Sequence, residues 1–79
     1  MRVVVVTAEW DDEAKVWSAE GNVEGLVTEA ESLEGLRERL MLVVPDLLRE
    51  YGEPDGDIAI ELIAHSHDHI AAATRRAAA

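Results

Sequence analysis

The sequence predicts an α+β fold, in which a three-stranded antiparallel meander is followed by one helix and a fourth strand. Short β-type segments alternate with acidic or glycine-containing turns in the first part of the chain. One long apolar stripe of helical period occupies the middle, and a last β-type segment follows a loop rich in Pro, Gly and Asp. We therefore expect the order β-β-β-α-β in a single domain over residues 1–70, with an alanine-rich tail over 71–79.

The first strand is expected over 2–10, where four consecutive valines (3–6) favour extended backbone. Consecutive valines make both faces of this strand apolar, whereas a single helix covers only one face of a sheet. We therefore expect a second polypeptide, such as another subunit, to cover the opposite face. The acidic residues that follow, Asp11, Asp12 and Glu13, predict a loop longer than the two residues of a tight hairpin.

The second and third strands are expected over 14–20 and 24–30, separated by a turn at Gly21-Asn22. Beyond the helix, the fourth strand is expected over 58–65. Its alternating pattern places Ile58, Ile60, Leu62 and Ala64 on one face. The inward faces of these strands are expected to supply half of the core, and the helix the other half.

The helix is expected to begin after Ser32, because serine is a favourable N-cap residue, and to stop at Gly52. Steps of three and four residues join its apolar positions into one stripe. That stripe consists of Leu33, Leu36, Leu40, Val43, Val44, Leu47, Leu48 and Tyr51. Pro45 lies within it and removes one backbone hydrogen bond, so we expect a kink there.

The charge of the chain limits the partners that it can attract. Its 79 residues include 17 Asp and Glu against seven Lys and Arg, for a formal net charge of −10. Such a chain repels nucleic acid and anionic lipid and attracts basic proteins, although acidic residues also serve solubility. It lacks the basic groove and the set of aromatic side chains that RNA-binding domains use, so direct nucleic-acid binding is not expected.

Composition also narrows the chemistry and the compartment. The chain has no cysteine, which excludes disulfides, thiolate metal sites and cysteine nucleophiles. No segment approaches the ~20 apolar residues of a membrane span, and the N-terminus does not resemble a signal peptide. We therefore expect a cytoplasmic protein with no membrane attachment.

Three alternating histidines, His65, His67 and His69, form the sharpest candidate for a metal site. Histidines two residues apart on a strand can share a zinc ion, but the third would stand ~13 Å from the first. A metal-dependent hydrolase is therefore an alternative, and a solvated strand end with ordinary histidines is the favoured interpretation. No nucleophile–base pair or glycine-rich phosphate loop is evident. We expect no enzymatic activity, no cofactor and no native metal.

Two tryptophans flank the first acidic loop and give the best candidate for a binding site. Trp10 and Trp17 lie beside Asp11, Asp12 and Glu13. An aromatic surface with a carboxylate rim is suited to docking a basic partner. The alternative is that both tryptophans pack over the open face of the sheet as part of the fold.

Four segments together resemble the HicB-like family of small bacterial proteins, and most closely its DUF1902 branch. They are the W-D-x-E-x-x-V-W hairpin (10–17), the G-L-V-T-E-A strand (25–30), the S-L-E-x-L helix start (32–36) and the P-x-L-L segment (45–48). The resemblance extends over about 3–64, most of the chain.

The resemblance implies a partial RNase H-like fold and an antitoxin-type role. HicB-like antitoxins bind a small basic RNA-cleaving toxin of the HicA type, and they are usually dimers or higher oligomers. The acidic charge of this chain fits such a partner. Full-length HicB antitoxins also carry a C-terminal DNA-binding module, for which Arg75 and Arg76 are no substitute, so operator binding is not expected. The alternative is a stand-alone oligomeric module that binds another protein or a small ligand.

Overall fold

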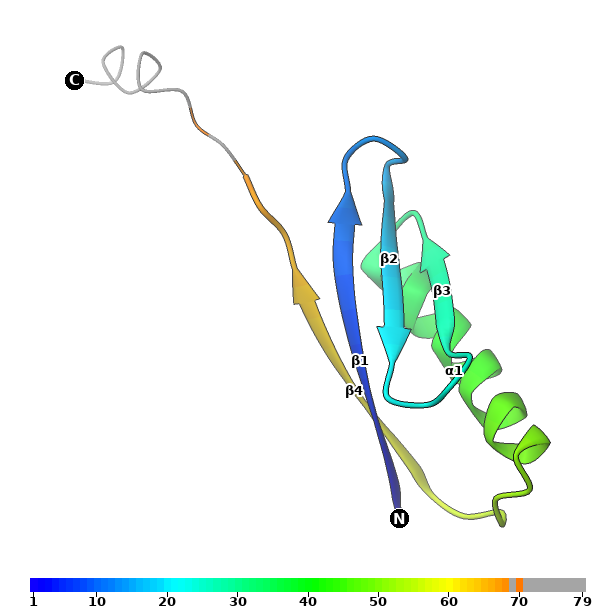
Figure 1. Ribbon diagram of the computed structural model, residues 1–79. Coiled ribbons are helices and arrows are strands. Elements are labelled where there is room, and N and C mark those ends of the chain that lie inside the picture. The colour runs from blue at the N-terminus through cyan, green and yellow to red at the C-terminus, as the bar shows by residue number, and fades with distance from the viewer. Residues whose placement is uncertain (69, 71–79) are drawn as a thin grey trace.

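A computed structural model of the protein describes residues 1–68 and 70 (Figure 1). Its elements follow the predicted order β-β-β-α-β. They are β1 (Arg2–Asp11), β2 (Val16–Gly21), β3 (Val27–Ala30), α1 (Leu33–Glu50) and β4 (Ile58–His65). The predicted α+β class is therefore confirmed, whereas the predicted alanine-rich tail over 71–79 lies outside the described residues.

The strands form one mixed sheet with the order β3-β2-β1-β4. The meander β1-β2-β3 is antiparallel, as predicted. After α1, the chain returns to the other side of β1, where β4 runs parallel to it from Arg2↔Ile58 to Glu9↔His65. β1 and β2 are the two interior strands, and β1 carries the longest apolar run of the four strands, its four valines.

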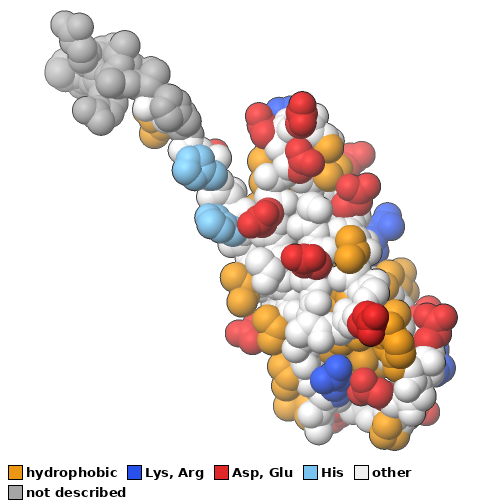
Figure 2. All heavy atoms as spheres, viewed as in Figure 1, with side chains coloured by type: hydrophobic (Ala, Val, Ile, Leu, Met, Phe, Trp, Pro, Cys, Tyr) orange, Lys and Arg blue, Asp and Glu red, His pale blue; other side chains and the backbone are white. Residues whose placement is uncertain are grey.

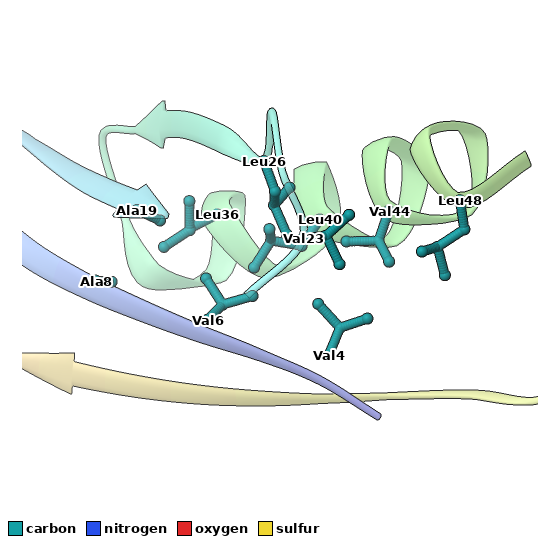
Figure 3. Close-up of a cluster of buried hydrophobic side chains, with 10 residues drawn as sticks. All are labelled: Val4, Val6, Ala8, Ala19, Val23, Leu26, Leu36, Leu40, Val44 and Leu48. Carbon is teal, nitrogen blue, oxygen red and sulfur yellow. The ribbon is translucent and has the colours of Figure 1, made fainter. Parts of the chain in front are cut away.

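The core lies between α1 and one face of the sheet (Figure 3). Side chains alternate along β1, so its even-numbered residues point toward the helix. The helix in turn buries every fourth residue from Leu36 to Leu48 against the sheet. The buried residues are Val4, Val6, Ala8, Ala19, Val23, Leu26, Leu36, Leu40, Val44 and Leu48. The helical stripe predicted from the sequence therefore supplies its half of the core, with the exception of Tyr51, which is exposed.

Both ends of α1 are capped as the sequence indicates. The Ser32 hydroxyl accepts a hydrogen bond from the backbone N–H of Gly35 at 3.0 Å. At the other end Gly52 adopts a φ of +76°, and the N–H of Glu53 donates to the Leu48 carbonyl. This pair of features is a Schellman motif, in which glycine avoids the steric cost of the left-handed conformation. One helix runs from cap to cap and includes Pro45.

The third strand begins later than the sequence predicts, at Val27 instead of residue 24. Gly25 has a φ of +86°, and the N–H of Leu26 donates to the Val23 carbonyl at 3.0 Å. This turn reverses the chain before β3 and lets Val23 and Leu26 enter the core from a loop. The Tyr51 hydroxyl donates to the Glu24 carbonyl at 2.8 Å, so the tyrosine holds this loop instead of filling the core.

The second strand also begins later than predicted, at Val16 instead of residue 14. Lys15 has a φ of +58°, a left-handed conformation that interrupts the extended backbone. The connection from β1 to β2 therefore has four residues, 12–15, which confirms the prediction of more than a two-residue hairpin.

Candidate protein-binding surface

The hairpin that joins β1 to β2 brings together all five residues predicted to bind a partner. Asp11 organises the loop, because its carboxylate accepts hydrogen bonds from the N–H groups of Glu13 and Ala14, each at 3.1 Å. Its carbonyl accepts a further bond from the N–H of Lys15 at 2.7 Å. Asp11 is thus engaged in the turn itself, an Asx-type role, while the Glu13 side chain at the tip is exposed.

Trp10 on β1 and Trp17 on β2 lie directly opposite each other in the antiparallel hairpin. Their ring centroids are 5.6 Å apart with an interplanar angle of 61°, an edge-to-face arrangement. Trp17 packs against the core, and both rings are half-buried. Register places them on the same sheet face as Ala8 and Ala19, which is the helix side. The tryptophan pair therefore supports the fold and still offers part of its surface to a partner.

Asp12 is the electrostatic centre of the loop. It accepts hydrogen bonds from the Lys15 ammonium at 2.9 Å and from the indole N–H of Trp10 at 3.3 Å. The bond and charge of Lys15, with help from Trp10, lower the pKa of the Asp12 carboxyl below its ordinary value of 3.8. Because Lys15 pairs with Asp12, the loop offers a partner less uncompensated charge than its sequence indicates.

Replacing Asp12 by asparagine is expected to lower stability slightly at neutral pH and to have no effect in acid. A carboxyl with a lowered folded-state pKa stabilises the fold above 3.8, its ordinary value, and this contribution disappears as pH falls through the lowered pKa. The measurement is the urea midpoint of the wild type and of Asp12→Asn at several pH values from about 7 down to about 3.

Glu13→Gln is the matched control for this experiment, because Glu13 is exposed in the same loop and its side chain has no ion pair among residues 1–68 and 70. Its midpoint should follow that of the wild type at every pH. A wild-type advantage over Asp12→Asn that persists unchanged in acid would show that the charge of Asp12 is not what stabilises the loop.

A second surface emerges only from the strand register. We call the sheet face turned away from α1 the open face. Its strand residues are Val3, Val5, Thr7, Glu9, Asp11, Val16, Ser18, Glu20, Val27, Glu29, Ala59, Glu61, Ile63 and His65. No described element covers this face, which is turned to the viewer in Figure 1.

The charges on the open face have a single sign. Each strand contributes one glutamate to its middle or end, and there is no lysine or arginine among the strand residues of this face. The four are Glu9, Glu20, Glu29 and Glu61, all exposed. Figure 2 shows acidic side chains from the hairpin end down over the strands, and hydrophobic ones gathered toward the opposite end. Sequence reasoning did not identify these glutamates as a group.

Apolar side chains lie among these glutamates. Val27 is 71% exposed, Ile63 48% and Val3 45%, so the open face retains apolar area that the helix cannot cover. Beside Val27 a shallow hollow of about 270 Å³ is lined by Thr7, Ser18 and the two glutamates Glu9 and Glu20. Exposed apolar area bordered by charge of one sign is typical of surfaces that bind another protein.

The prediction that both faces of β1 are apolar holds only for Val3 and Val5, since Thr7 and Glu9 follow them on the open face.

Two of the three candidate histidines lie in the part of the chain that the structure describes. His65 ends β4 and His67 follows it, both exposed, whereas His69 lies outside the described residues. Within residues 1–68 and 70, no group of three His, Asp or Glu side chains is placed to hold a metal ion. Nor does the described part contain a helix long and apolar enough to cross a membrane.

Comparison with known proteins gives a family and a similar solved structure. The family described as a domain of unknown function, DUF1902, matches residues 3–73. The crystal structure of the hypothetical protein TTHA1013 from the extremely thermophilic bacterium Thermus thermophilus is similar, with 41% sequence identity and a TM-score of 0.74. The similarity covers 87% of this chain and 100% of that chain. A comparison with curated proteins finds no match.

Proposed function

The chain belongs to the DUF1902 family, and we propose on that basis that it is a HicB-like antitoxin-type protein. In this proposal it binds a small basic RNA-cleaving toxin of the HicA type and neutralises it by covering the toxin's surface. The protein acts by binding alone, without a cofactor and without catalysis of its own.

The observation that carries this proposal is the single sign of charge on the open face. Four exposed glutamates from four different strands share the face with half-exposed Val3 and Ile63. A ribonuclease that binds RNA must present cations to phosphates, and those cations attract a carboxylate-bearing surface. The apolar side chains between the glutamates add the dehydrated contact that converts a long-range attraction into a stable interface.

A binding role also accords with the solvation of the ionisable groups. No polar or charged side chain is fully buried among the described residues. General acid–base catalysis depends on groups whose pKa is shifted by burial or by close charges toward the working pH. The lowered pKa of Asp12 makes that carboxyl a stronger acid and has a structural cause in the Lys15 contact. These features support recognition over chemistry.

The experiment co-expresses and purifies the chain with the product of the adjacent gene, which this proposal expects to be a small basic protein. The double variant Glu20→Lys/Glu29→Lys reverses two charges on the open face and is expected to weaken the complex by at least about tenfold. Titration calorimetry measures the affinity, and an RNA-cleavage assay of the partner measures neutralisation.

The matched control is Glu38→Lys/Glu50→Lys, which makes the same change in net charge on the exposed side of α1. It should leave both affinity and neutralisation close to those of the wild type at physiological salt. Equal losses from both double variants would mean that net charge alone acts and that the open face is not the interface. Absence of any complex with the neighbouring basic protein would overturn the antitoxin role.

A further inference from the structure

β4 forms one edge of the sheet and is paired along its whole length on one side only. Its eight residues match β1 from Arg2↔Ile58 to Glu9↔His65. On the other side, no strand among residues 1–68 and 70 pairs with it. An edge of this length presents a row of backbone N–H and C=O groups that can template another strand.

The edge of β4 lacks the usual protection against such pairing. Soluble proteins shield long edges with lysine, proline, bulges or very short strands. The segment IAIELIAH contains no lysine, arginine or proline, and Glu61 is its one acidic residue. The opposite edge, β3, is only four residues long and carries Glu29. The two edges of the same sheet are therefore built differently.

Side chains along β4 are only partly covered. Ile58, Ile60 and Leu62 pack against the core but remain half-buried, whereas their β1 neighbours Val4 and Val6 are fully buried. Figure 1 shows the reason, since α1 lies toward the β3 side of the sheet and away from β4. On the other face Ile63 is 48% exposed. Apolar side chains of β4 are thus partly exposed on both faces of the sheet, along an edge that no described strand pairs with.

We propose that two copies of the chain pair through β4 in antiparallel fashion, so that the two sheets join into one continuous sheet about a two-fold axis at Leu62. Residues opposite each other then have numbers that add to 124. This register places Leu62 opposite Leu62, Glu61 opposite Ile63 and Ile60 opposite Ala64 of the second copy. A two-fold pairing satisfies both edges at once, and the only edges left are the two short β3 strands.

Repulsion between carboxylates favours this register over the neighbouring register with its axis at Glu61. Both faces must remain continuous across the junction, so the axis can shift only in steps of one residue, to Glu61 or Ile63. An axis at Glu61 would place two carboxylates directly opposite each other, which is destabilising. An axis at Ile63 shortens the overlap within 58–65, while the axis at Leu62 pairs seven residues, 59–65.

The proposed dimer and the proposed toxin complex should respond to salt in opposite directions. Each copy carries a formal net charge of −10, so added salt screens the repulsion between copies and should strengthen the dimer. Binding of a basic partner to the acidic open face should weaken with salt. This inference does not depend on the proposed function, because edge pairing uses the backbone groups of β4 and leaves the open face, to which β4 contributes Glu61 and Ile63, turned outward.

The test uses the absence of cysteine in the chain. Leu62→Cys should form a disulfide-linked dimer under mild oxidation, because opposite residues in an antiparallel pair lie ~4.5–5.5 Å apart between Cα atoms, within disulfide range. Glu61→Cys and Ser18→Cys are the controls. The first tests the alternative register, and the second places a thiol on the open face of β2, away from the edge. Light scattering of the cysteine-free wild type at low and high salt measures the dimer directly.

The proposal predicts rapid cross-linking of Leu62→Cys, at least about tenfold slower cross-linking of both controls, and a wild-type dimer that strengthens with salt. A wild type that stays monomeric at both salt concentrations would overturn it. Cross-linking of Leu62→Cys no faster than that of Ser18→Cys would also overturn it. Faster cross-linking of Glu61→Cys than of Leu62→Cys would overturn the register.

Discussion

Replacing Leu40 by alanine is expected to lower the free energy of unfolding by about 2–5 kcal/mol. Leu40 is 1% exposed and lies in the middle of the buried positions of α1. Truncation removes its contacts with the sheet and leaves a cavity that the surrounding strands can fill only in part. A core of this size rarely supplies more than about 3–5 kcal/mol of net stability, so the variant should be largely unfolded near room temperature. Urea unfolding followed by circular dichroism measures the change.

Leu42→Ala is the matched control for Leu40→Ala. The same chemical change two residues along the same helix affects a side chain that is 73% exposed, and it should alter stability by less than about 0.5 kcal/mol. A loss of stability at Leu42 as large as at Leu40 would contradict the burial pattern described for α1. It would show that the outer side of the helix also packs against protein in solution.

The contrast between Leu40 and Leu42 shows why the helix was predictable from the sequence. The contacts that define a helical stripe are local, so the spacing of Leu36, Leu40, Val44 and Leu48 already determines which face is apolar. The caps at Ser32 and Gly52 are equally local, because each depends on one residue type at one position.

The strands were predictable in kind and order but less so in extent. The boundary of β3 depends on the left-handed conformation of Gly25, and that of β2 on the left-handed conformation of Lys15. Neither conformation changes the apolar pattern from which strands are predicted. The parallel pairing of β4 with β1 joins segments more than 50 residues apart, and no local signal in either strand specifies its neighbour.

The two parts of the candidate binding surface also differ in whether they depend on local contacts or on pairing between distant segments. The hairpin residues from Trp10 to Trp17 are close in sequence, so their proximity follows from the turn alone. The glutamates of the open face come from four strands, and only the register reveals that they share a face. Composition alone therefore indicates that the chain is acidic, but not on which surface the acidic residues lie.

Replacing Gly21 by alanine is expected to lower the free energy of unfolding by about 1–3 kcal/mol. Gly21 ends β2, and a Cβ there would lie 2.5 Å from Cδ2 of Leu26 and 3.2 Å from the carbonyl oxygen of Val5. Leu26 is 2% exposed and belongs to the core, so its side chain has little room to move aside. The cost arises from packing alone, because Gly21 does not have a positive φ and its backbone suits alanine.

Two comparisons isolate that contact. Gly56→Ala places the new methyl group where no atom lies within 4 Å, so it should leave stability unchanged or raise it by about 0.4–1 kcal/mol through the unfolded chain. Leu26→Ala removes the clashing methyl groups, so Gly21→Ala should cost less in that background than in the wild type. The urea midpoints of the wild type, Gly21→Ala, Leu26→Ala and the double variant measure this coupling. If Gly21→Ala costs the same in both backgrounds, Leu26 is not the obstacle, and the close approach to the Val5 carbonyl must account for the loss of stability.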